Sequence, residues 1–245
     1  MQRDNFILQK GTIMGNPSFR QELIQIVQEH AVLQNPWLLE KKEKSNLNKY
    51  DFIYWLSQEY HVSVAFVNWF LWTAAQTSDQ TAKIILVQNV WEELGEGNIV
   101  NTHVSILQQF LEDLSVSPEI REILYETKNY LARMEAIVKK SFFHGLGALG
   151  PANEYLLKLE YSEMYKLYNK FANETSEDSQ HFIPEPTFFT VNLDADEGHS
   201  KRMFDLIDAM VKNSLDEEKV MEGNQLALDA RLLFYEGLLR IPVRH

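Results

Sequence analysis

The stretch FFTVNLDADEGHSKRMFDLIDAM, residues 188–210, has the spacing of one face of a helix. Residues three and four apart form a single stripe: Phe189, Asn192, Asp196, His199, Met203, Leu206 and Met210. Such a stripe normally faces a core. Its ends are apolar, but its middle carries an amide, a carboxylate and an imidazole. The stretch therefore predicts a helix with a polar centre on its buried side.

Polar side chains at a buried position need partners, because an unpaired buried carboxylate takes up a proton or binds a counter-charge. Asp196 and His199 are three residues apart, so they are neighbours on a helix surface and can close on one ion. Two other interpretations stay open from the stripe alone. It could be a solvated face with an ion pair, or His199 could be a hydrogen-bonded core histidine.

Composition favours a helical fold. The chain has 245 residues, 45% of them hydrophobic, with only 10 Gly and 7 Pro. That length supports one large core, and the low Gly and Pro content favours long helices. We find no strand pattern, internal repeat or long linker. The sequence predicts an all-α bundle of about seven to eight helices, with residues 1–245 forming one domain.

Charge and cysteine content exclude several classes of function. The formal net charge is −12, and no basic stripe compensates it, so we expect no nucleic-acid partner. The chain has no Cys. This removes disulfides, Cys-ligated zinc, iron–sulfur clusters and thiol nucleophiles, and it is consistent with the cytoplasm, where we expect the protein. The longest apolar run, residues 62–75, is too short for a membrane span, and the N-terminus has no signal-peptide pattern.

Periodicity and turn residues give approximate element boundaries. An irregular lead-in is expected over residues 1–16, a polar connection over 40–48, a turn at HGLGALGP (144–151) and a polar loop over 172–186. The expected helices cover residues 18–34, 47–76, 81–94, 118–143, 188–210 and 215–239, with two more that open near Asn101 and before Glu154.

Three further polar groups lie on otherwise apolar stripes. Glu93 follows Val90 by three residues, although the spacing of Glu92 is equally acceptable. His103 opens the stripe of the helix that begins near Asn101. Glu154 opens the stripe of the next helix but one, where Glu160 competes with it. Carboxylates and imidazoles contributed by separate helices are how non-haem iron and manganese sites are built.

These segments carry a family resemblance. The pattern EELG (92–95) followed by His103, GALGPANE (147–154) and FFTVNLDADEGH (188–199) resembles the haem-oxygenase-like diiron proteins. The resemblance covers nearly the whole chain and is strongest to cyanobacterial-type members, relatives of the chlamydial protein associating with death domains (CADD-like proteins).

The resemblance implies a dinuclear iron centre that activates dioxygen to oxidise a small organic molecule. Matched by position, the metal ligands are Glu93, His103, Glu154, Asp196 and His199, with Glu96 as runner-up for Glu93. The family's last motif reads His-x-x-x-Asp-x-x-His, and Asn192 stands here where the family has its first histidine. An amide is a much poorer iron ligand than imidazole, so the centre holds one or two ions, with manganese as the alternative metal.

Other functions of the same fold remain to be weighed. A thiaminase-like enzyme needs a cysteine nucleophile, and a quinone-cofactor synthase needs basic and histidine side chains in place of carboxylates. A haem oxygenase needs a proximal histidine, for which only His30 qualifies, and a kinked glycine-rich helix, of which we identify none. From another class, the chain could be a metal-poor, catalytically inactive binding or interaction protein. Whether it is an enzyme, and whether it forms a homodimer, the sequence leaves open.

Overall fold

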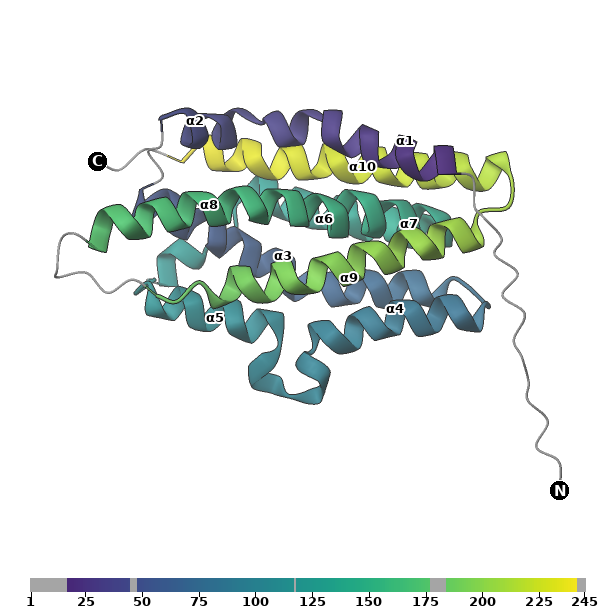
Figure 1. Ribbon diagram of the computed structural model, residues 1–245, viewed down its shortest axis with the longest axis horizontal. Coiled ribbons are helices and arrows are strands. Elements are labelled where there is room, and N and C mark those ends of the chain that lie inside the picture. The colour runs from purple at the N-terminus through teal and green to yellow at the C-terminus, as the bar shows by residue number, and fades with distance from the viewer. Residues whose placement is uncertain (1–16, 45–47, 117, 177–183, 242–245) are drawn as a thin grey trace, which may run out of the picture.

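The computed structural model describes residues 17–44, 48–116, 118–176 and 184–241 (Figure 1). The α-helices are α1 (Pro17–Glu29), α2 (Pro36–Lys44), α3 (Lys49–Ala75), α4 (Gln80–Glu93), α5 (His103–Asp113), α6 (Tyr125–Lys140), α7 (Phe142–Leu149), α8 (Leu156–Ser176), α9 (Thr187–Met210) and α10 (Ser214–Leu239). Short 3-10 segments are η1 (Ala31–Gln34), η2 (Gly95–Gly97), η3 (Ile99–Asn101) and η4 (Pro118–Arg121), and η5 (Gly150–Tyr155) is a π-helix. No strand occurs in these ranges, so the all-α prediction is confirmed.

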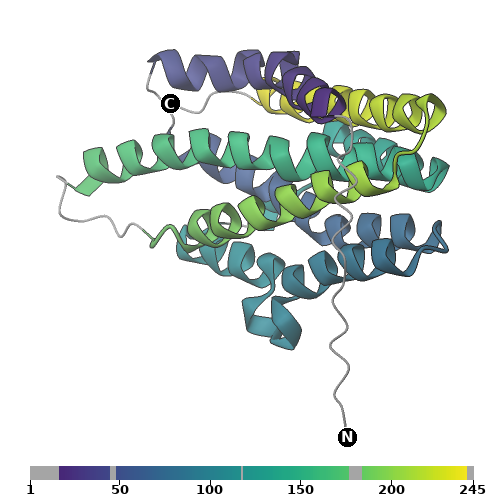
Figure 2. The ribbon, with the colours of Figure 1, turned by 45° about the vertical axis from the view of Figure 1, so that its right-hand side comes forward.

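The helices form a layered bundle around α3. Helices α1 and α2 lie along α10 on one side, and α4 and α5 lie on the opposite side, with α3 and α6 to α9 between them (Figures 1 and 2). Helix α9 packs on α4, α5, α8 and η5, so it joins the middle layer to the layer of α4 and α5. No helix of the described ranges is long and apolar enough to cross a membrane.

Helix α3 is central because it is apolar nearly all round. Trp55, Trp69 and Phe70 are at most 1% exposed. The ring of Trp55 stacks on that of Phe189 at the start of α9, with 6.1 Å between ring centroids. A helix with so little polar surface belongs in the middle of a bundle, and only a few of its apolar residues, among them Val64 and Leu71, stay exposed.

Several boundaries differ from the prediction. The first helix ends at Glu29, and residues 36–44, expected to end in a polar connection, form α2. Lys41 of α2 can be buried because its ammonium group lies 2.7 Å from an Asp51 carboxylate oxygen on α3. The helix expected over 118–143 is three pieces, η4, α6 and the first residues of α7. The loop expected over 172–186 begins later, because α8 continues to Ser176. Part of that loop and the expected lead-in over residues 1–16 lie outside the described residues.

The predicted turn at residues 144–151 is wrong, because this segment is helical in α7 and η5. Its glycines allow close packing instead of a chain reversal. A Cβ on Gly147 would lie 2.0 Å from the carbonyl oxygen of Val220, and one on Gly145 would lie 2.4 Å from Oγ1 of Thr73. The chain thus contains the glycine-rich helix that the sequence analysis did not identify.

Candidate metal centre

Four of the predicted ligands meet inside the bundle. His103 Nδ1 lies 3.0 Å from Glu93 Oε2, and His199 Nδ1 lies 3.5 Å from both Glu93 Oε1 and Glu154 Oε2. The four residues come from α4, α5, η5 and α9, and each is at most 9% exposed. Segments far apart in sequence therefore deliver two carboxylates and two imidazoles to one buried place, which we call the polar cluster.

Local backbone features aim these side chains. Between α4 and α5 the chain reverses through Gly95 and Gly97, both at positive φ, and a Cβ on Gly95 would lie 2.6 Å from the backbone carbon of Asn101. The Thr102 hydroxyl caps α5 by accepting from Ser105 N at 3.0 Å, which makes His103 the first helical residue. Glu154 lies on the π-helix, a distortion often found at functional sites.

The charged groups of the polar cluster shift one another's pKa values. Burial disfavours the charged form of His199, but the carboxylates of Glu154, Glu93 and Glu92 outweigh burial and raise its pKa to about 9. Burial likewise opposes protonation of His103, and the neighbouring Glu93 carboxylate raises the His103 pKa overall. For Glu154, complete burial raises the carboxyl pKa, against the opposing effect of His199. Each group thus depends on the others for charge compensation.

The cluster leaves donor atoms available. Glu154 Oε1 and His199 Nδ1 are buried without a hydrogen-bond partner among the described residues. A cavity of about 20 Å³ adjoins Glu93, His103, Asn192 and Tyr161, room for one water-sized body. Among the described residues, no group of three carboxylate or imidazole side chains already surrounds one metal position. The side chains of the cluster contact one another instead. The donor types and the two unpartnered atoms nevertheless fit an iron or manganese ion.

The other two predicted ligands are on α9. Asn192 is 8% exposed and lines the same cavity, and its Nδ2 donates to Phe188 O at 2.6 Å. That hydrogen bond leaves Oδ1 as the atom it can offer. Asp196 is within α9, but its side chain lies outside the described residues. Its role as a ligand stays a prediction.

The competing glutamates lie elsewhere. Glu96 is exposed in the η2 turn at φ 53°. Glu160 is fully buried but faces Arg231, whose Nε and Nη2 donate to Glu160 Oε2 at 3.0 and 2.7 Å. The same guanidinium contacts Glu59 Oε1 at 2.5 Å. Glu160 thus belongs to a second buried group, the Arg231 cluster, and the structure brings only Glu154 to the polar cluster.

Glu92, which spacing alone could not separate from Glu93, has its own contact with the polar cluster. Its Oε2 lies 2.8 Å from His199 Nε2, on the opposite side of the imidazole from Glu93. Arg202 also binds Glu92. Arg202 was not among the residues predicted from the sequence, although it follows His199 by three residues and therefore lies beside it on the helix.

The other histidines of the described ranges are used in different places. His30 Nδ1 accepts from Val32 N at 3.1 Å, and its Nε2 is 3.2 Å from an Asp229 oxygen. His61 contacts the carbonyl of Arg121, and His144 contacts Ser141 and Glu222. Because His30 is engaged in this way at the start of η1, its geometry does not support a proximal haem ligand.

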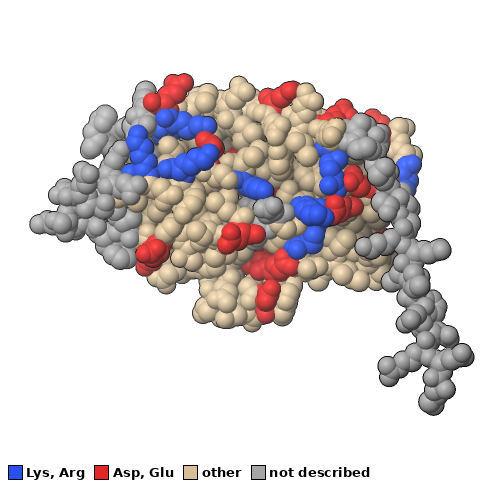
Figure 3. All heavy atoms as spheres, viewed as in Figure 1, with Lys and Arg blue, Asp and Glu red and all other residues tan. Residues whose placement is uncertain are grey.

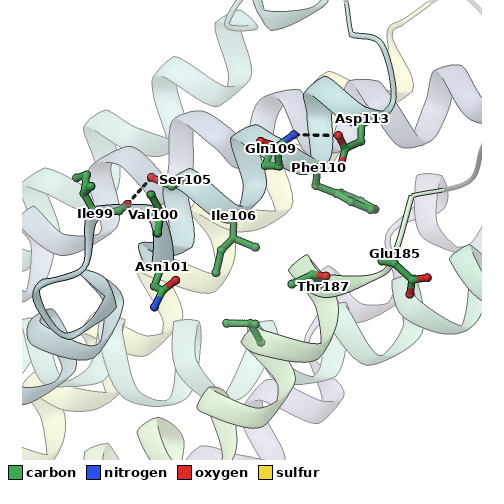
Figure 4. A pocket seen from close by; sticks show the side chains of 11 residues that line it. Ile99, Val100, Asn101, Ser105, Ile106, Gln109, Phe110, Asp113, Glu185 and Thr187 are labelled. Atoms are coloured by element: carbon green, nitrogen blue, oxygen red, sulfur yellow. Dashed lines mark hydrogen bonds between the residues drawn. The ribbon is translucent and has the colours of Figure 1, made fainter.

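A larger groove of about 710 Å³ lies beside the cluster (Figure 4). Helix α5 separates them in part, since His103 lines the small cavity while Ile106 and Phe110 line the groove. On α9, Val191 lines the groove and the next residue, Asn192, lines the cavity. The groove is mostly apolar, with the carboxylates of Asp113 and Glu185 at one end (Figure 4).

Comparison with known proteins identifies the family. The chain is similar in structure to a CADD-like protein of unknown function from Nostoc punctiforme, with 18% identity and a TM-score of 0.72 over 90% of this chain and 95% of that one. A TenA homologue from Pseudomonas syringae pv. tomato gives 15% identity and a TM-score of 0.71, covering 98% and 99%. A domain with a haem-oxygenase-like fold from Shewanella denitrificans gives 15% and 0.66, covering 89% and 90%.

These likenesses confirm the predicted haem-oxygenase-like fold. No protein with a curated description matches the chain in sequence. The sequence model of one family, described as iron-containing redox enzymes, does match, over residues 53–232. That range includes Glu93, His103, Glu154 and His199. The chain therefore belongs to the family of iron-containing redox enzymes.

Proposed function

We propose that this protein is a non-haem iron oxidoreductase that uses dioxygen as co-substrate to oxidise a small organic molecule. The observation that carries the proposal is the polar cluster, in which Glu154 Oε1 and His199 Nδ1 are buried without a hydrogen-bond partner among the described residues. Family membership supports iron as the metal. Manganese prefers the same mixed ligands and is the alternative.

The residues of the cluster have separate tasks in this proposal. Glu93, His103, Glu154 and His199 would hold the metal, with Asp196 as a fifth ligand. Bound iron supplies dioxygen binding and electron transfer. The carboxylates keep a cationic centre stable in a buried place, and the apolar surroundings, including Phe66 and Leu157 at the small cavity, keep bulk water away.

The groove of Figure 4 supports a small organic substrate, because its volume is in the range of small-molecule sites. Its apolar wall along Ile106 and Phe110 suits a hydrocarbon or aromatic body. Asp113 and Glu185 disfavour a substrate with an anionic group at their end of the groove, since like charges repel.

Metal content tests the proposal directly. Protein produced with iron supplied should retain metal, and Fe(II) or Mn(II) should raise the unfolding temperature because binding stabilises the folded state. Glu154→Gln and His199→Ala should lose both effects. His30→Ala and His61→Ala are the matched controls, since both histidines contact other groups. An unchanged unfolding temperature with millimolar metal at neutral pH would exclude the metal centre.

Asn192 is the position that tests whether one or two ions bind. An amide oxygen is a much poorer iron ligand than an imidazole nitrogen, so wild-type protein should contain closer to one metal than two. Asn192→His places an imidazole on the same helical position, and the metal stoichiometry should rise toward two. An increase in dioxygen-dependent absorption should accompany it. A wild type that already binds two irons tightly would show that Asn192, or a water it holds, is sufficient.

The second candidate function is a metal-poor binding protein on the same fold. The contacts within the polar cluster favour it, because imidazoles that lie 3.0 to 3.5 Å from carboxylate oxygens can balance their charge without an ion. The metal-content experiment separates the two functions. If Asn192→His also binds no metal, the binding-protein function becomes the better account.

A further inference from the structure

The imidazole of His199 lies between the Glu92 carboxylate on one side and those of Glu93 and Glu154 on the other. Its Nε2 lies 2.8 Å from Glu92 Oε2, while its Nδ1 faces Glu93 and Glu154 at 3.5 Å each. The side chain is 1% exposed. The imidazole therefore has one nitrogen in a short hydrogen bond, and the other faces the polar cluster with no hydrogen-bond partner in the part of the chain that the structure describes.

Glu92 is itself fixed from several directions. Gln88 Nε2 donates to Glu92 Oε1 at 2.9 Å, and Arg202 donates to Oε2. The Arg202 guanidinium is held in turn by Asn89, whose Oδ1 accepts from Nε at 3.1 Å and from Nη2 at 3.0 Å. Asn89 is fully buried on α4. Glu92 is thus an anchored carboxylate, which makes it suited to set the orientation of a neighbouring ring.

We propose that Glu92 is a positioning residue for His199, which holds the His199 proton on Nε2 and presents Nδ1 to the metal. This inference rests on the proposed metal centre. A neutral imidazole carries one proton, and the nitrogen that donates it cannot bind a metal. A carboxylate that accepts from Nε2 fixes which nitrogen is free and raises its basicity. Glu92 is therefore outside the ligand set, although it is adjacent to Glu93 in sequence.

The position of Glu92 on α4 supports this division of work. Two consecutive helical residues point about 100° apart, so Glu92 and Glu93 reach His199 from different sides. Glu93 faces the small cavity with His103, whereas Glu92 is a quarter exposed and does not line that cavity. Replacing Glu92 should therefore weaken metal binding without removing a ligand.

Anaerobic Fe(II) titration measures this effect. Loss of a carboxylate that orients a ligating histidine typically weakens metal affinity by about 10- to 100-fold, which is the expectation for Glu92→Ala. Glu92→Gln should lose less, because its amide oxygen can still accept from Nε2, and it serves as the variant of choice if Glu92→Ala does not fold. Glu135→Ala is the control: Glu135 is also an ion-paired glutamate on a helix, half exposed and outside the cluster. Its affinity should equal that of the wild type.

A spectroscopic measurement separates orientation from general stability. With histidine labelled by ¹⁵N and Zn(II) bound as a diamagnetic probe, wild-type His199 should show a protonated Nε2 and a metal-shifted Nδ1. In Glu92→Ala the protected Nε2 proton signal should be lost or joined by that of the other tautomer. Glu135→Ala should retain the wild-type pattern.

The outcomes are distinguishable from a failure of the proposed function. If wild-type protein binds neither Fe(II) nor Zn(II), the metal centre itself is wrong and this inference is overturned with it. If the wild type and folded Glu92→Ala bind Fe(II) equally, with the same His199 nitrogen signals, the metal centre stands and the role of Glu92 is overturned.

Discussion

At the scale of single residues, the polar side chains on the α9 stripe are the informative ones. Phe189, Met203 and Leu206 are at most 1% exposed, as the stripe predicts, and His199 is buried among them. Apolar residues at this spacing would have predicted only a core. A buried imidazole needs partners, and that requirement is what directed attention to carboxylates on other helices.

The metal-free protein should lose stability as pH rises from about 6.5 to about 9. The folded-state pKa of His199 is raised to about 9 from 6.5, so its contribution is fully present below 6.5 and lost as pH rises through the folded value. This difference in pKa corresponds to about 3 kcal/mol. Urea unfolding across this pH range measures it, and His199→Gln should flatten the curve. An equally steep curve for His199→Gln would contradict the assignment.

The Arg231 cluster poses a different problem, because one guanidinium serves two buried carboxylates. Arg231, Glu59 and Glu160 are each at most 1% exposed. Burial raises the pKa of Glu160, against the opposing effect of Arg231. Glu160 Oε1 has no hydrogen-bond partner among the described residues. Glu160 therefore takes up a proton more readily than an ordinary glutamate.

Arg231→Met should destabilise the fold by about 3–5 kcal/mol, because it leaves buried carboxylates without their counter-charge. Glu160→Gln should cost much less, since the amide oxygen can still accept from the guanidinium and one negative charge disappears. Chemical denaturation of both variants measures the difference. Equal losses would mean that Glu160 is fully ionised and that Arg231 depends on it.

At the scale of elements, apolar periodicity predicted the long helices well. The glycines of residues 144–151 led to the prediction of a turn where the structure has a helix. Helices α3, α9 and α10 lie within about two residues of their expected bounds. Helix α7 was missed because glycine and proline usually mark turns, and a sequence does not show which backbone a glycine will contact. The break between α6 and α7 depends on a cap by Ser141, which accepts from His144 N, and an apolar stripe does not reveal it.

Gly147→Ala should destabilise the protein by at least about 1–3 kcal/mol, the usual effect of overpacking, because the added carbon would meet the α10 backbone at 2.0 Å. Gly198→Ala is the matched control. It is also a helical glycine, but its added carbon would meet only Arg202 Nη1 at 3.6 Å, an ordinary contact. Alanine there should stabilise the fold by about 0.4–1 kcal/mol. Thermal unfolding compares them, and a harmless Gly147→Ala would show that α7 and α10 can move apart.

At the scale of the whole molecule, tertiary structure decided between candidates that periodicity left equal. Glu92 and Glu93 both fit an apolar stripe, and the bundle uses both, on opposite sides of His199. Glu154 and Glu160 also fit equally. Only the position of Arg231 on α10, 71 residues further along the chain, assigns Glu160 to a separate cluster. No local pattern contains that information.

The molecule also has an uncharged outer face on α4. The exposed residues of α4 include no charged side chain, although the chain carries a formal net charge of −12. On the face in Figure 3, Lys and Arg side chains lie beside Asp and Glu side chains. The uncharged α4 face is formed by apolar residues of α4 and its C-cap between 44% and 66% exposed: Ile84, Val87, Trp91 and Leu94.

We expect this face to pair with the same face of a second copy. Two acidic chains repel over most of their surfaces, and the α4 face is one place where they can meet without bringing like charges together. Sedimentation should show a dimer that Trp91→Glu dissociates, while Tyr125→Glu, at an exposed position on α6, should not. A wild-type monomer at about 100 µM would contradict this.

The volume of the small cavity sets a condition on turnover. About 20 Å³ admits an ion or a water molecule, whereas an organic substrate needs more than ten times that space. A substrate held in the groove can therefore approach the centre only when the α5 and α9 side chains between them rearrange. Where the rearrangement shifts the helices themselves, it takes microseconds to milliseconds. Catalysis would then be gated by the protein, and its maximal rate should fall as solvent viscosity rises, even with metal and dioxygen in excess.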